Sequence, residues 1–355
     1  MMPPDLTALS WCFGELRQSL MQADTQLGAA LAGGESGTAE LEQATLSLHR
    51  ADGAMQLLVL PGVSQITRQA DALVQAMLSA GVQLDEARLR SLRRAFHALI
   101  EYCEGLLRLD PPQPLHLFPY YRDLLLARGE QGAQPCDLFF PDLSVSLPVS
   151  QLPLGEDDPQ LLGHARSMFE RGLLALMRSP DSEGARSMQD AVSMVCASAL
   201  ASRDRAFWWV AQAFFDSLAD ATLSLDAQVK RMLARVNQKL RKAIEQDNGS
   251  DPRLLAEMMF LLARVEMPNE AASEVRRVYR LDDAVPENLE AARFDPVDPQ
   301  VLAEAGSSLE RSLQALQGIV DGNLYELKTF ADCIEAFVKT CLQVPGNGLR
   351  ELCKG

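Results

Sequence analysis

The stretch that decides the fold is "LEQATLSLHRADGAMQLL", residues 41–58. Its apolar residues recur at steps of three and four, so they form one stripe along a helix: Leu41, Ala44, Leu48, Ala51, Met55 and Leu58. An apolar stripe of this kind is buried from solvent only when other helices pack against it. The stretch therefore predicts an amphipathic helix inside a helical bundle.

The neighbouring segments have the same period. Residues 5–32, 63–77 and 85–109 each carry an apolar stripe at helical spacing, and Pro61-Gly62 ends the helix that holds the opening stretch. Four helices with short connections are typical of an up-and-down bundle. We therefore predict a first, four-helix domain over residues 1–110.

Prolines then become frequent. Residues 111–159 contain nine of the chain's 19 prolines, and proline removes amide donors and blocks helix continuation. We therefore predict a proline-rich connector over residues 111–158, with one short helix around 117–128. Its aromatic residues favour a connector that packs against the bundle.

Helical spacing resumes in residues 159–355, where we predict a second bundle. Its expected helices cover 159–178, 181–203, 204–221 and 225–247, followed by short ones at 251–265, 270–280 and 286–293. Residues 302–338 have nearly heptad spacing, which predicts a long C-terminal helix that packs along the bundle or forms a homodimer. The predicted fold class is all-α, with tandem helical bundles.

Composition excludes several classes of function. The 355 residues are 47% hydrophobic with a net charge of −15, and the scattered arginines form no basic face for nucleic acid. No stretch approaches the roughly 20 apolar residues that span a bilayer, so we expect no membrane insertion. The seven cysteines form no Cys-x-x-Cys pair, which favours free thiols in a reducing compartment. The N-terminus lacks the pattern of a signal peptide, so we expect a cytoplasmic protein.

His49 is the candidate reactive residue. On a helical wheel it lies about 100° from the buried stripe and shares a face with Thr45, Asp52, Gly53 and Gln56. Glycine inside a helix costs about 1 kcal/mol relative to alanine, and leaving room for another protein surface would explain that cost. These four residues are the predicted docking face.

Other motifs for chemistry are missing from the sequence. His97, His116 and His164 have no carboxylate or cysteine at metal-ligand spacing, and no glycine-rich phosphate loop or nucleophile–base set is present. We therefore expect no cofactor, no metal and no ATP-binding kinase domain in this chain.

The pattern His-x-x-x-Gly on the second helix of a bundle resembles a histidine phosphotransfer domain. That family's usual pattern is His-x-x-Lys-Gly, and "HRADG" (49–53) has Asp52 in place of the lysine. A carboxylate one turn from a phosphoryl group repels it, so this departure works against phosphotransfer.

A wider resemblance covers nearly the whole chain. The chain is similar to the N-terminal region of type IV pilus chemosensory hybrid histidine kinases (ChpA/PilL type) and to the related FimL pilus-regulatory proteins. The segments that carry this similarity are, in order, "LHRADGAMQLLVLPGVSQITRQADALVQAML", "LFFPDLS", "FERGLLALMRS", "RAFWWVAQAF" and "VYRLDD". The resemblance implies tandem phosphotransfer-like bundles that act in the control of twitching motility. FimL-type proteins lack the histidine, so His49 points towards the kinase side.

Two hypotheses follow. In the first, the chain is a non-catalytic module that binds signalling proteins, namely a receiver domain, a histidine kinase or a pilus-regulatory partner. In the second, it is an active phosphotransfer domain that accepts phosphate on His49, which is the only enzymatic role we expect.

Overall fold

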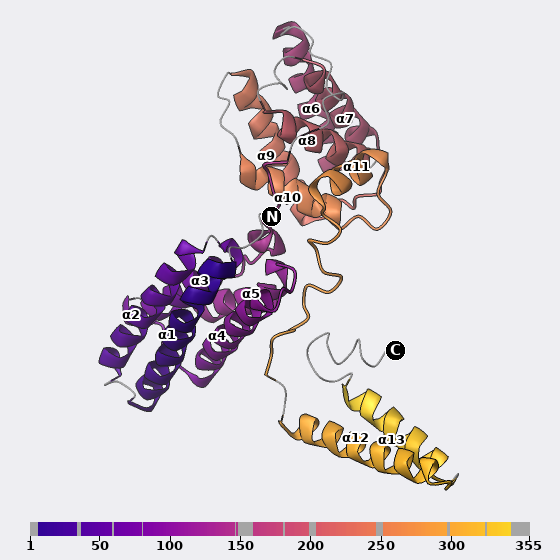
Figure 1. Ribbon diagram of the computed structural model, residues 1–355. Helices are drawn as coiled ribbons and strands as arrows, with labels where there is room; N and C mark the ends of the chain where they lie inside the picture. The colour runs from indigo at the N-terminus through magenta and orange to yellow at the C-terminus, as the bar shows by residue number, and fades with distance from the viewer. Residues whose placement is uncertain are drawn as a thin grey trace. The chain divides into compact units, whose positions relative to one another are not determined.

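The computed structural model describes residues 6–33, 37–58, 60–79, 81–145, 147, 159–179, 182–198, 204–245, 251–296, 299–323 and 325–341. These residues form helices and turns and contain no strand (Figure 1). The prediction of an all-α fold is confirmed. The chain divides into two compact units, of which one comprises residues 4–134 and 288–355 and the other residues 135–287.

The first unit, here the N-terminal unit, begins with five helices and a 3-10 turn: α1 (Leu6–Gly33), α2 (Thr38–Leu57), α3 (Pro61–Ser79), α4 (Glu86–Leu107), η2 (Pro114–Leu117) and α5 (Phe118–Arg128). Helix α1 packs against α2 and α4, while α3 packs against α2 and α5. The short helix predicted in the proline-rich region is α5, which packs on α3 and α4 as a fifth member of the bundle.

Local sequence accounts for the ends of these helices. The Asp85 side chain accepts a hydrogen bond from the Arg88 amide at 2.8 Å and so caps the start of α4. Helix α5 ends at Gly129, whose φ of +89° is the left-handed conformation that glycine adopts without strain.

The second unit, here the middle unit, contains a 3-10 turn and six helices: η3 (Pro135–Leu138), α6 (Pro159–Arg178), α7 (Ser182–Cys196), α8 (Arg205–Ala219), α9 (Ala227–Ile244), α10 (Pro252–Ala263) and α11 (Glu270–Tyr279). Asp226, Asp251 and Asn269 cap the starts of the last three helices, each accepting from the backbone amide three residues later at 2.8 to 2.9 Å.

Helix α8 is the centre of the middle unit. Four of its aromatic side chains are at most 1% exposed: Phe207, Trp208, Phe214 and Phe215. Beside this cluster, α6 and α7 cross closely at Gly172 and Gly184, where an added Cβ on Gly172 would lie 2.7 Å from the Gly184 carbonyl oxygen.

The chain returns to the N-terminal unit through residues 288–296, here called the strap. A helix was predicted over 286–293, and that prediction is wrong, because these residues form turns. The Asn288 side chain accepts from the Glu290 amide, and the Phe294 amide donates to the Tyr120 hydroxyl at 2.9 Å. Both amides are therefore bonded outside any helical ladder.

The predicted long C-terminal helix is two helices, α12 (Pro299–Val320) and α13 (Glu326–Cys341), which pack against each other as a hairpin (Figure 1). The break lies at Gly322, whose φ is +96°. The Gly322 amide donates to the Ile319 carbonyl and the Asn323 amide to the Gly318 carbonyl, which is the Schellman arrangement that ends a helix. Heptad spacing continued across the break because α13 resumes the same period.

Candidate functional site

The candidate site lies on the exposed face of α2. Leu48, Ala51 and Met55 are fully buried, as the sequence stripe predicts, and they fix which way the helix faces. His49 directly follows Leu48, and its side chain is 61% exposed. The imidazole therefore lies at the surface.

One ring nitrogen of His49 faces the protein. Nδ1 lies 3.1 Å from the Thr45 carbonyl oxygen and 3.3 Å from Oδ1 of Asp71, which is on α3. Within the described part of the chain, Nε2 has no hydrogen-bond partner. Because Nδ1 has two oxygens beside it, the ring is oriented with Nε2 available for a proton or an electrophile.

Asp52 joins α2 to α3. Its Oδ1 accepts from the hydroxyl of Thr67, which is fully buried on α3, at 2.8 Å, and its Oδ2 accepts from Gln56 Nε2 at 2.6 Å. A lysine at position 52 has no acceptor for the Thr67 hydroxyl. The departure from the phosphotransfer pattern is therefore also part of the packing between these two helices.

The site is acidic. Burial raises the pKa of Asp71, the nearby Asp52 charge raises it further, and His49 lowers it in part. Two carboxylates thus lie close to one imidazole. Such an arrangement repels a phosphoryl dianion.

The predicted docking residues are placed differently from one another. Gly53 and Gln56 are exposed beside His49, and Asp52 is half-buried. Thr45 is only 9% exposed, and its hydroxyl donates to the Leu41 carbonyl at 3.1 Å, so it contributes its backbone oxygen and not its side chain. An added Cβ on Gly53 would meet no atom within 4 Å. The surface around Gly53 is open.

Gly62, in the first turn of α3, has a different role. An added Cβ there would lie 2.4 Å from Cβ of Pro114, so the glycine lets η2 pack closely on the start of α3. The structure therefore places Gly62 in the interior.

Sequence reasoning missed the site where the strap docks. Phe294 packs edge-on against Tyr102 and His116 at ring-centroid distances of 6.0 and 6.4 Å. Nδ1 of His97 lies 2.8 Å from the Phe294 carbonyl oxygen. Two histidines that looked isolated in the sequence therefore hold the strap on the N-terminal unit. The aromatic Phe294 between charged residues was the available signal, and it lies directly after the helix predicted over 286–293.

Ion pairs fasten the same segment. Arg94 on α4 forms two parallel bonds to Asp295, both 3.0 Å, and also pairs with Asp123 on α5. Arg293 donates to Nε2 of His116 at 3.1 Å. Burial lowers the pKa of His116 to about 4, and the Arg293 charge lowers it as well. His116 is therefore neutral at pH 7 and accepts this bond.

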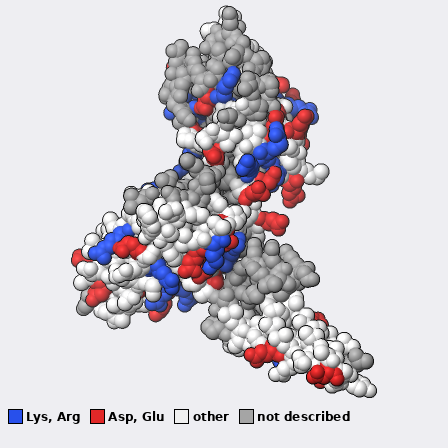
Figure 2. Space-filling model, viewed as in Figure 1, with Lys and Arg blue, Asp and Glu red and all other residues white. Residues whose placement is uncertain are grey.

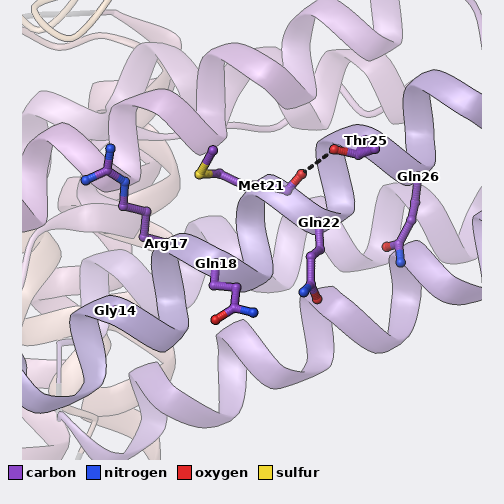
Figure 3. A pocket seen from close by; sticks show the side chains of 7 residues that line it. All are labelled: Gly14, Arg17, Gln18, Met21, Gln22, Thr25 and Gln26. Atoms are coloured by element: carbon purple, nitrogen blue, oxygen red, sulfur yellow. Dashed lines mark hydrogen bonds between the residues drawn. The ribbon is translucent and has the colours of Figure 1, made fainter.

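Two surface hollows lie on the N-terminal unit. One, of about 460 Å³, runs along a single face of α1, and the side chains that line it include Arg17, Gln18 and Gln22 (Figure 3). The other, of about 390 Å³, lies between α1 and α4 and is lined by Arg90, Arg93 and other residues. Neither brings a nucleophile next to a general base. Acidic and basic side chains lie interspersed on the visible surface (Figure 2).

Among the described residues, no group of three or more histidine, cysteine, aspartate or glutamate side chains is placed to hold a metal ion. No helix formed by those residues has the length and apolar character needed to cross a membrane.

Comparison with protein families finds one match. Residues 155–292 match the model of the FimL scaffold protein second domain. The matched range contains α6 to α11, the helices of the middle unit, and does not include His49. Comparisons with curated proteins and with solved structures find no match. The resemblance to FimL inferred from the sequence is confirmed over this range.

Proposed function

We propose that this chain, FimL-like over residues 155–292, is a non-catalytic scaffold in the control of type IV pili and binds signalling proteins through its helical surfaces. The family match carries the proposal, because that family is described as a scaffold. The net charge of the chain, −15, favours partners with neutral or basic surfaces.

The proposed docking face on the N-terminal unit is the exposed row of α2. It consists of Leu46, His49, Gly53 and Gln56, which follow one another at steps of three and four and so share one side of the helix. Leu46 is 53% exposed, which supplies an apolar contact, and the open surface at Gly53 lets a partner approach the backbone. An apolar side chain beside polar ones is the usual composition of a docking surface.

Binding of a purified receiver domain from a pilus chemosensory pathway, measured by calorimetry, tests this face. The variant Gly53→Arg places a long side chain in the open space and should weaken binding at least about tenfold, which is roughly 1.4 kcal/mol. Gly14→Arg is the matched control, because Gly14 is an exposed glycine of α1 with nothing within 4 Å of an added Cβ. Equal binding by both variants and the parent chain would contradict the proposed face.

Phosphotransfer through His49 is the second candidate, favoured by the exposed imidazole with Nδ1 held by Thr45 and Asp71. In that reaction Nε2 attacks the phosphorus of a receiver's aspartyl phosphate. A P–N bond forms, the P–O bond to the aspartate breaks, and the imidazole retains a positive charge or loses a proton to water.

Incubation with a ³²P-labelled phospho-receiver separates the two candidates. Acid-labile label on the chain that disappears in His49→Gln would establish phosphotransfer. A chain that binds the receiver and acquires no label would exclude it and leave the scaffold proposal intact.

A further inference from the structure

The C-terminal hairpin has its small side chains inside and its large ones outside. The row of α12 that faces α13 consists of buried small residues at steps of three and four: Ala305, Ser308, Ser312 and Ala315, each at most 6% exposed. Small side chains let two helices approach closely and leave little volume between them. The seam between α12 and α13 is therefore already filled.

The large apolar side chains of α12 form a second row. Leu302, Leu309, Leu313, Leu316 and Val320 follow steps of seven, four, three and four, with the missing heptad position at Gly306. They are between 40% and 73% exposed. At 100° per residue this row lies about 90° round the helix from the buried small row, on a flat face of the hairpin.

Helix α13 extends the same face. On a helical wheel Phe330, Cys333 and Phe337 share a side with Cys341, which is fully buried, and this side is here called the inner row. The outer row lies about 90° from it at heptad steps and consists of Leu327, Ala331, Ile334 and Val338. In both helices the outer row lies about 90° from the inner row in the same rotational sense about the helix axis. Because α13 runs antiparallel to α12, this places both outer rows on the same flat side of the hairpin. This side, the outer face, comprises the two outer rows and contains no charged residue.

The extent of the outer face matches an interface. Helix α12 has 22 residues and is about 33 Å long, and two helices side by side are about 20 Å wide. The hairpin thus presents roughly 600 Å² of face, close to the ~800 Å² per partner of a stable interface. The visible surface of the hairpin is largely uncharged (Figure 2).

The charges beside the outer face favour a second copy over other occupants. Glu310 on α12 and Glu335 on α13 flank it together with Lys328 and Lys339. Asp321 and Asp332 lie on the same flank, which therefore carries both signs. Such a mixture is self-complementary, since the acids of one copy can meet the lysines of another across a two-fold axis. An anionic lipid surface would instead favour flanks that are basic throughout.

We propose that the outer face of the α12–α13 hairpin binds the same face of a second copy of this chain, so that two hairpins form a four-helix bundle and the protein is a homodimer. Each hairpin contributes its outer rows to a common apolar core. The inference does not depend on the proposed scaffold function, because self-association is measured without any signalling partner.

Sedimentation velocity of the full chain, from about 1 to about 100 µM, tests the proposal. The parent chain should sediment as a dimer. Leu313→Glu should give a monomer, because it places two buried charges at the centre of the interface. Glutamate has a high helix propensity and Leu313 is exposed within one hairpin, so the variant should keep its helical content by circular dichroism.

Leu174→Glu is the matched control, since Leu174 on α6 is 58% exposed and Leu313 is 57% exposed. This control should remain a dimer. The milder change Leu313→Ala should raise the dimer dissociation constant at least about tenfold. A parent chain that stays monomeric throughout, a dimer that survives Leu313→Glu, or a control that dissociates equally would overturn the proposal.

Discussion

Replacing Gly53 and Gly62 by alanine, one at a time, should change stability in opposite directions. Both glycines belong to consecutive helices of the N-terminal unit, and the chemical change is identical. At Gly53 the added methyl group meets no atom within 4 Å, so only the helix propensity changes. Alanine is about 0.8 to 1.0 kcal/mol better than glycine inside a helix, so Gly53→Ala should raise the free energy of unfolding by roughly that amount.

At Gly62 the added Cβ would lie 2.4 Å from Cβ and 3.1 Å from Cγ of Pro114. The ring of Pro114 and the backbone of η2 must then shift, and overpacking of this kind costs about 1 to 3 kcal/mol. After the gain in helix propensity, Gly62→Ala should lower the free energy of unfolding by about 1 to 2 kcal/mol.

Urea denaturation followed by circular dichroism gives both values, and hydrogen exchange in α2 and α3 assigns them to this unit. A shift of 1 kcal/mol corresponds to about 2 to 4 °C in Tm for a unit of this size. If Gly53→Ala destabilises the chain, a surface covers Gly53 and the open docking face does not exist. If Gly62→Ala is neutral, the contact between η2 and α3 is looser than described.

Three further predictions concern the acidic site and the strap. Asp71→Asn should stabilise the chain at pH 7 and have little effect at pH 3, as denaturation at the two pH values will show. The raised pKa of Asp71 means that the folded chain binds this proton more tightly than the unfolded chain does, so the carboxyl costs stability as pH rises above about 4. His116, with its pKa lowered to about 4, should make the parent chain less stable as pH falls from 6.5 towards 4, because the unfolded chain takes up the proton first. His116→Gln should lose less stability over that range. Equal slopes of unfolding free energy against pH for the variant and the parent chain would refute the assignment. Phe294→Ala should lower the free energy of unfolding by about 2 kcal/mol, less than the 3 to 5 kcal/mol typical of a fully buried phenylalanine, because Phe294 is half-buried. It should also speed hydrogen exchange in the strap. Unchanged exchange would show that the ring does not hold the segment.

Helices and their buried faces were predictable because their signal is local. In α2, Leu48, Ala51 and Met55 are spaced at the helical period, and all three are buried. The capping aspartates before α9 and α10 are equally local, since each carboxylate bonds an amide three residues away. The break in the C-terminal hairpin was missed because Asp321-Gly322-Asn323 keeps the heptad register on both sides.

Contacts between distant residues were not predictable in the same way. Asp52 looked only like an unfavourable substitute for lysine, and its bond to the Thr67 hydroxyl depends on how α2 and α3 are packed. His116 looked isolated because Arg293, which donates to it, is 177 residues away. The lowered pKa of His116 follows from its burial and from the Arg293 charge, and not from its own segment.

The sequence by itself determined that this protein is helical, which side of each helix is apolar, and that its surface is acidic, since these properties follow from spacing and composition. The tertiary structure decided which apolar rows find a partner within the chain. In α12 the small row is covered by α13 and the leucine row is not, although both repeat at the same period. Periodicity shows which side of a helix is apolar, and only packing determines which surface covers that side.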